Sequence, residues 1–187
     1  LSIIGIGAPV INALEPSAVL VFENSDNITI DNIIFTNFSG GVPFIIEVNS
    51  RGNPQNDQIS IEQYLLPCNP AILINGSTGV VIQNTMVINS CIAIGILNSS
   101  LTLINNVTIY NATFTGIFGL DINDTTIKDS LIIPLNVNPN NMGILIGIIY
   151  QNKNRNLTIM DTIINNISFY GASIYYTDNI YKQFNNI

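Results

Sequence analysis

Short apolar stretches alternate with asparagine along most of the chain, and the whole pattern repeats. Within residues 79–129, the stretches VVIQN, VIN and IGILN are followed by LINN, IYN and FGLDIN in the same order. The apolar stretches are short and rich in β-branched side chains, which suits pleated strands, and helical periodicity is absent. A repeat of roughly 20 to 30 residues built only from short strands predicts a solenoid.

Two markers keep the same period. One is a strand start that recurs at Ile30, Ile59, Ile82, Leu103, Ile127 and Ile159. The other is an asparagine after a strand, which recurs once per repeat at a nearly constant spacing, at Asn24, Asn49, Asn75, Asn98 and Asn123. The period predicts an all-β parallel β-helix of six to seven coils, in which these asparagines form one structural stack at a bend, because Asn tolerates the left-handed corner conformation.

Length, charge and composition limit the functions that the chain can have. The 187 residues fit a single domain, 1–187, which we expect to be a segment of a longer chain. The net charge of −7 and the five Lys and Arg residues argue against a nucleic-acid partner. The absence of His removes the commonest general base and zinc ligand. The longest apolar run, residues 142–150, is about half of what a membrane-spanning helix needs.

The two cysteines, Cys68 and Cys91, are separated along the chain by close to one repeat. Equivalent residues of stacked coils lie about 4.8 Å apart, which is within the reach of a disulfide. Their registers differ by about one residue, so a disulfide and two buried free thiols both remain open at this point.

The order of motifs from the start of the chain carries a family resemblance. SIIGIG and PVIN precede NITIDNIIFTN, and this resembles right-handed parallel β-helix proteins of the pectin-lyase-like class. The phrase FTNFSGG at residues 35–41 is also similar to repeats of polymorphic outer-membrane proteins, although later copies lack the paired glycines. The resemblance implies a right-handed β-helix and a secreted or surface role, and its motifs describe a coil rather than a reaction.

Candidate catalytic groups do not gather in the sequence. Hydrolysis of glycosides needs two carboxyls at a defined separation, whereas the acids here are scattered, with Asp121, Asp124 and Asp129 the nearest approach to a cluster. Asp129 and Asp161 occupy positions that asparagines fill in other repeats, which favours polar corners over a calcium site. We therefore predict no catalytic residues, no metal site and no cofactor.

Asn-x-Ser/Thr glycosylation motifs are more frequent than chance would give. Nine occur, whereas 29 Asn and 26 Ser and Thr in random order give roughly four. Asn75, Asn98 and Asn123 belong to the predicted stack, where glycans one coil apart would crowd. The better glycan acceptors lie nearer strand starts and bends, at Asn27, Asn37, Asn111, Asn156 and Asn166.

These observations together predict a secreted or cell-surface structural or adhesive glycoprotein. Its expected partners are further copies of itself or neighbouring β-helix segments, because the open end of a β-helix presents unpaired edges. In one form of this hypothesis the chain is a subunit of an extracellular fibre or filament that is assembled end to end. The alternative is a carbohydrate-active enzyme or carbohydrate-binding module of the pectin-lyase-like class, with tyrosines lining a groove.

Overall fold

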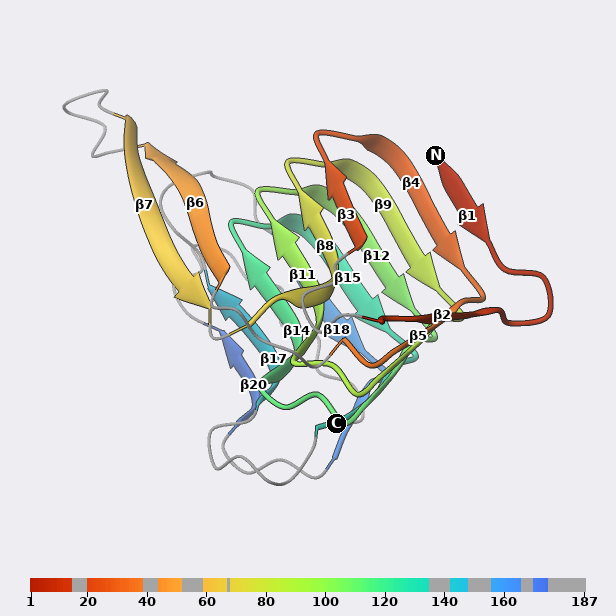
Figure 1. The fold of residues 1–187 in the computed structure, drawn as a ribbon. Helices are drawn as coiled ribbons and strands as arrows, with labels where there is room; N and C mark the ends of the chain where they lie inside the picture. The colour runs from red at the N-terminus through yellow and green to blue at the C-terminus, as the bar shows by residue number, and fades with distance from the viewer. Residues whose placement is uncertain are drawn as a thin grey trace.

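Three parallel sheets form the main body of the described residues. The computed structural model describes residues 1–14, 20–38, 44–51, 59–66, 68–134, 142–147, 156–165 and 170–174, and Figure 1 shows their arrangement. Within these ranges every regular element is a strand, and the three parallel sheets have six strands each. The chain visits sheets A, B and C in rotation. This all-β arrangement is consistent with the predicted solenoid.

The three sheets differ mainly in strand length. Sheet A contains β1 (Ser2–Ile4), β4 (Asp26–Asp31), β9 (Thr78–Gln83), β12 (Ser100–Asn105), β15 (Asn123–Lys128) and β18 (Leu157–Met160). Sheet B contains the shorter β2 (Val10–Asn12), β5 (Ile34–Thr36), β10 (Met86–Ile88), β13 (Thr108–Tyr110), β16 (Leu131–Ile133) and β19 (Ile163–Ile164). Sheet C contains β3 (Leu20–Glu23), β8 (Pro70–Asn75), β11 (Ile92–Leu97), β14 (Thr115–Leu120), β17 (Met142–Gly147) and β20 (Tyr170–Ile174).

Among the strands of the three parallel sheets whose side chains are described, alternate residues point into one shared core. Parallel pairing in register places like residues on top of each other, so the core consists of columns of buried aliphatic side chains. The column of sheet A is Ile30, Ile82, Ile104, Ile127 and Ile159, each at most 2% exposed. The predicted strand-start marker was wrong at Leu103, which pairs with Val81 one residue before this column.

An antiparallel hairpin interrupts the rotation between sheets B and C. It consists of β6 (Phe44–Arg51) and β7 (Ile59–Leu66), with Asn49 opposite Ile61. The sequence analysis placed Asn49 and Ile59 in successive coils, and both assignments were wrong. The apolar–polar alternation of the hairpin is the same as that of a coil strand, and only the pairing partner distinguishes the two.

The central strands of sheet C, β8, β11 and β14, are buried on both faces. All six residues of β11 and of β14 are buried. One set of side chains belongs to the main core, and the other set packs into a second apolar cluster that contains Leu73, Leu97, Phe118 and Leu120. Parallel strands covered on both sides have near-continuous apolar sequences, as seen here. The outer face of sheet C is therefore closed to solvent at these positions.

Candidate interaction face

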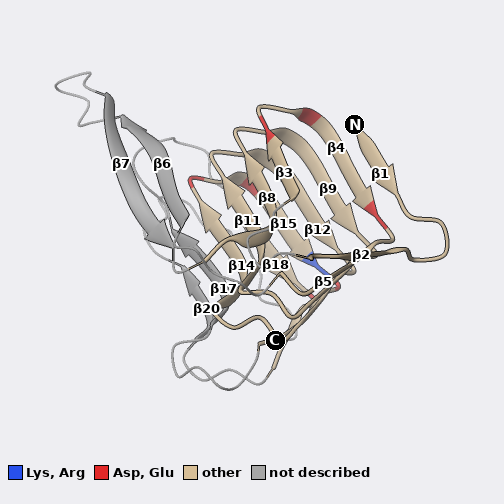
Figure 2. Cartoon of the chain, viewed as in Figure 1, with Lys and Arg blue, Asp and Glu red and all other residues tan. Residues whose placement is uncertain are grey.

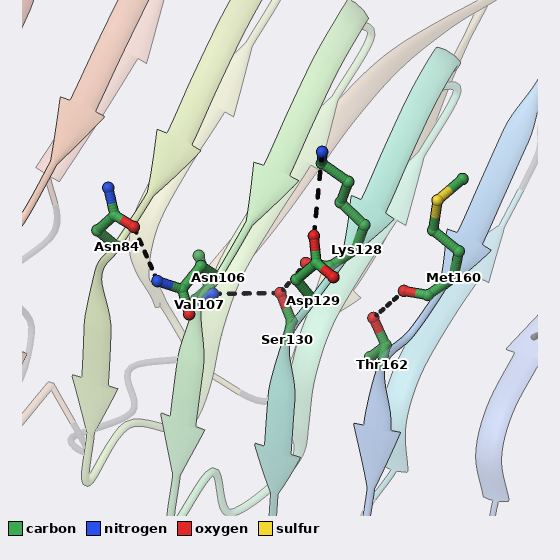
Figure 3. Close-up of polar contacts among 8 residues, drawn as sticks. All are labelled: Asn84, Asn106, Val107, Lys128, Asp129, Ser130, Met160 and Thr162. Carbon is green, nitrogen blue, oxygen red and sulfur yellow. Dashed lines mark hydrogen bonds and ion pairs between the residues drawn. The ribbon is translucent and has the colours of Figure 1, made fainter. Parts of the chain in front are cut away.

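Asparagine and aspartate occupy the bend that joins sheet A to sheet B. Asn32, Asn84, Asn106, Asp129 and Asp161 all have positive φ, between 47° and 57°. A side chain with a short polar group accepts this left-handed conformation more readily than others do. The Asn106 amide donates to Asn84 Oδ1 at 2.8 Å, as Figure 3 shows, and the Asn84 amide donates to Asp31 Oδ1 at 2.9 Å. We call these five residues the A/B corner column.

A second amide column follows sheet B. Asn37, Asn89 and Asn111 have φ between 53° and 63°. Their amides form a ladder along the solenoid, in which Asn37 donates to Asn12 Oδ1 at 2.8 Å, Asn89 donates to Asn37 Oδ1 at 3.1 Å, and Asn111 donates to Asn89 Oδ1 at 3.0 Å. We call Asn37, Asn89 and Asn111 the B/C corner column, and their ladder ends on Asn12, the last residue of β2.

The bend after sheet C corrects the predicted asparagine stack. Its positive-φ residues are Asn24, Gly76, Asn98 and Asp121. The N–H groups of the first three donate to the carbonyl of the residue before the next corner residue, at Asn75, Leu97 and Leu120. Asn75 lies one residue before this column and pairs with Leu97, and Asn123 is the first residue of β15. With Asn49 in the hairpin, only Asn24 and Asn98 of the predicted five share the bend. An Asn on either side of a bend gives nearly the same spacing, which explains the error.

Buried hydroxyls below the bends connect neighbouring coils. The Ser99 hydroxyl donates to the Leu97 carbonyl at 2.6 Å and accepts the Ser77 N–H at 3.1 Å. Ser77 repeats the arrangement, donating to the Asn75 carbonyl and accepting the Ser25 N–H. Ser130 serves the A/B bend in the same way, bonding the Val107 N–H (Figure 3). Each hydroxyl thus satisfies backbone groups of two coils at once.

The bend geometry accounts for much of the excess of glycosylation motifs. An Asn at a positive-φ corner is followed by a buried residue and then by the outward-facing first residue of the next strand, as in Asn106, Val107 and Thr108. Threonine suits that outward strand position. The corner therefore generates Asn-x-Thr whether or not a glycan is attached.

The predicted glycan acceptors differ in their surroundings. Asn27 is exposed, with φ of 54°. Asn37 and Asn111 use their amides in the B/C corner column, and the Asn156 amide donates to Asp124 Oδ1 at 2.8 Å. Asn166 lies outside the described residues. A glycan is attached through the amide nitrogen, so Asn27 is the most suitable acceptor among the four that are described.

A disulfide joins Cys68 to Cys91, with a Cα–Cα distance of 6.1 Å. Both cysteines are buried and belong to the second apolar cluster outside sheet C. Cys68 lies just after the hairpin in the chain, and Cys91 precedes β11, so the bridge ties the return from the hairpin to the next coil. Of the two states that the sequence left open, the structure has the bridged one.

Sheet B presents its outward side chains to solvent. Its first outward column is Val10, Ile34, Met86, Thr108, Leu131 and Ile163, and its second is Asn12, Thr36, Ile88, Tyr110 and Ile133. We call these residues the outer strip. Val10, Tyr110 and Ile163 are 60%, 45% and 57% exposed, and the residues between them are half-buried. The strip is largely apolar and is bordered by the A/B and B/C corner columns.

The outer strip was missed in the sequence, although a signal for it was present. A strand with one solvated face alternates apolar and polar residues. In sheet B the sequences MVI and LII are apolar on both faces, and IFT and TIY are apolar at two positions of three. Apolar residues at outward positions of several successive strands indicate either a covered face or an interaction surface.

Charge lies beside the outer strip rather than on it. None of the six strands of sheet B contains Lys, Arg, Asp or Glu, and β2 and β5 are tan throughout in Figure 2. Asp31 ends β4 at the border. Hydrogen bonds from the Asn84 amide, and then from Gln83, lower the pKa of the Asp31 carboxyl from its usual 3.8. Lys128 and Asp129 lie 3.9 Å apart and are both largely exposed, so their pair contributes little stability.

The described residues offer no cluster for metal or acid–base chemistry. Among them, no group of three or more His, Cys, Asp or Glu residues converges. This part of the chain also contains no helix of the length and apolarity needed to cross a bilayer. The outer strip is the largest apolar feature that the described strands present on their outer faces.

Searches of protein-family models, of curated proteins and of solved structures find no match to this chain.

Proposed function

We propose that this chain is a secreted or cell-surface structural or adhesive glycoprotein, built as a right-handed parallel β-helix and extended end to end by further coils. The right hand follows the strong preference of parallel crossover connections. The observation that supports the proposal is the edge of the first described coil, where β1, β2 and β3 each pair with only one neighbour among the described strands. A parallel edge of this kind accepts another strand through its unpaired backbone groups.

The backbone of β1 is suited to such extension. Thr29 N–H bonds to the Leu1 carbonyl and Gly5 N–H bonds to the Asp31 carbonyl, so the odd-numbered residues face β4. By the alternation of a parallel ladder, the backbone groups of Ser2 and Ile4 face the free edge. Large apolar side chains are exposed around this coil, with Ile4 at 62%, Ile6 at 95% and Leu14 at 90%. A further coil would cover them.

Two features support an extracellular setting. The Cys68–Cys91 disulfide persists in oxidising compartments and is rare in the cytosol. Charged residues make up only 9% of the chain, and amide and hydroxyl ladders satisfy the polar groups at the bends. Such a surface is suited to permanent contact rather than to steering of charged ligands.

Carbohydrate binding is the second candidate. Tyr110 is 45% exposed on the outer strip. It lies on the strip between two columns of amide side chains, of which Asn106 and Asn111 are the nearest in sequence. An aromatic face with flanking amides is suited to stacking on a sugar ring and bonding its hydroxyls. This candidate requires no further copy of the chain.

The test is to express the whole chain through a eukaryotic secretory pathway and to examine the secreted product by electron microscopy and peptide mass spectrometry. We expect rods longer than one chain, a Cys68–Cys91 bridge and a glycan on Asn27. Ile4→Pro removes an N–H at the free edge and keeps the bonds to β4, so it should shorten the rods. Val21→Ala, on the exposed face of β3, is the control and should not.

Three results would overturn the proposal. Wild-type protein that forms no rods longer than one chain at any concentration would contradict the end-to-end assembly. Retention inside the cell with reduced cysteines would remove the extracellular setting. Cleavage of a polysaccharide by the purified chain would replace a structural role with a catalytic one.

A further inference from the structure

We propose that the outer strip of sheet B packs face to face against the outer strip of a second copy of this chain. This deepens the proposed function, on which it rests, by adding a lateral contact to the end-to-end one. The strip is exposed, two side chains wide and six strands long. Its central residues on β10, β13 and β16 include Met86, Ile88, Leu131 and Ile133, which gain most from removal of water.

Charge favours a second copy as the occupant. The chain carries a net charge of −7, so two copies repel each other over most approaches. Sheet A exposes charged groups at Asp26, Asp31 and Lys128. In sheet C the second apolar cluster covers the central strands β8, β11 and β14, and β3 exposes the charged Glu23. Sheet B carries no charged residue, as Figure 2 shows for β2 and β5. It is therefore the face on which two copies can meet without apposing like charges.

Geometry favours the same occupant. Both copies have strands spaced by about 4.8 Å, so the side-chain ridges of one strip match the grooves of the other along its whole length. A two-fold axis parallel to the solenoid axis would bring the A/B corner column of each copy against the B/C corner column of the other. Asp129 and Asp161 would then face the asparagine side of the partner rather than each other.

The size of the strip sets the expected strength. Five strand spacings of about 4.8 Å and a width of about 10 Å, which is the length of a three-residue strand, give roughly 240 Å² per copy, or roughly 500 Å² in total. Stable specific interfaces start at about 1,000 Å², so an isolated pair of chains should associate weakly. Chains already joined end to end present several strips in a row, and the combined contact is much stronger. Lateral pairing should therefore depend on concentration for single chains and be persistent for rods.

The experiment compares charge insertions on two faces of one coil. Tyr110→Lys places a cation on the outer strip at a position that is 45% exposed, and Thr108→Lys places one in the neighbouring column. Leu103→Lys places the same cation on sheet A in the same coil, at a half-buried position, and is the matched control. Thermal melting by circular dichroism checks that all three fold. Sedimentation equilibrium of the full chain then measures the monomer–dimer constant.

The comparison is made in the Ile4→Pro chain, in which end-to-end assembly is limited. We expect that chain to dimerise as its concentration rises, and both outer-strip variants to raise its dissociation constant at least tenfold. Leu103→Lys should leave it within twofold. An Ile4→Pro chain that stays monomeric at millimolar concentration would overturn the proposal, as would equal weakening by Leu103→Lys. Binding of monomer to insoluble polysaccharide or to phosphatidylcholine vesicles, lost in Tyr110→Lys while dimerisation is unchanged, would assign the strip to that ligand instead.

Separate variants test the lateral contact and the end-to-end contact. Ile4→Pro should shorten the rods and leave the concentration-dependent lateral dimer. Tyr110→Lys should leave single rods and abolish their pairing side by side. Rods that pair normally in Tyr110→Lys overturn the lateral contact alone, and dimers without rods in the wild type overturn the end-to-end assembly alone.

Discussion

Thr102 is a buried hydroxyl without a partner, and its replacement by Val should stabilise the protein. The side chain is 2% exposed, and its Oγ1 has no hydrogen-bond partner within the described structure. Thr102 stacks in β12 on Val80 of β9, which is fully buried, and the column continues to Ile28 of β4. Valine has the same shape as threonine, so Thr102→Val fills the same space with a methyl group in place of the hydroxyl.

The expected gain follows from the cost of the buried hydroxyl. An unsatisfied buried polar group costs about 1–3 kcal/mol, and we expect Thr102→Val to recover about 1–2 kcal/mol of that. For a chain of this size that corresponds to a rise in Tm of about 2–8 °C. Differential scanning calorimetry measures it directly. The control is Thr126→Val, at an outward, half-buried position of β15, which should change stability by less than about 0.5 kcal/mol.

A lower Tm for Thr102→Val would refute the reasoning, because it would mean that the hydroxyl is bonded in the folded protein. Thr102→Ser separates the effect of the buried methyl group from the effect of the hydroxyl. It keeps the hydroxyl and removes a buried methyl group, so it should destabilise the protein by about 1 kcal/mol.

Three further predictions concern the ladders and the bridge. Ser99→Ala leaves the buried Ser77 N–H unpaired and should lower the free energy of unfolding by about 1–3 kcal/mol in urea titrations. The double change Cys68→Ala and Cys91→Ala opens the loop that the bridge closes and should cost about 3 kcal/mol, with reduction of the wild type giving the same loss. Because the pKa of Asp31 is lowered in the folded state, its contribution to stability is complete above the usual pKa of 3.8 and disappears as the pH falls through the lower folded value. Tm measured from pH 5 to pH 2 should therefore fall less steeply for Asp31→Asn than for the wild type, and parallel curves would contradict this.

The repeat that predicted the solenoid is visible in the sequence because parallel stacking makes equivalent residues alike. Ile82, Ile104 and Ile127 occupy one column, and each lies in the short apolar strand of its own repeat. A local pattern of this kind fixes strand position and inward direction. It therefore predicted an all-β architecture with parallel pairing between repeats.

The hairpin and the bend register were not predictable by the same means. Phe44, Ile46 and Val48 alternate with other residues as a coil strand does, and nothing within β6 itself specifies that its partner is the antiparallel β7. Likewise, Asn75 followed by Gly76 leaves two candidates for the corner. Gly76 takes it, with φ of 60°, because glycine adopts the left-handed conformation without strain.

The outer strip was missed in the sequence for a different reason. Sequence patterns report which residues point inward, and an apolar residue such as Ile88 or Ile133 at an outward position is read as core. Only the pairing of β10 with β13 and of β13 with β16 aligns those residues into a strip. Such an apolar strip on a solenoid can be recognised only once the register of the strands is known.

The inserted hairpin also has a consequence for the order in which the chain folds. Pairing of β3 with β8 joins Leu20 to Ile72 across the whole hairpin, whereas pairing of β8 with β11 joins Ile72 to Ile94, which is a single repeat further along the chain. The longer loop costs about 0.8 kcal/mol more to close, unless β6 and β7 have already come together and shortened it. We therefore expect the coils from β8 to β16 to form a nucleus and the first two coils to join last. The N-terminal coils would then be the region that opens first under load.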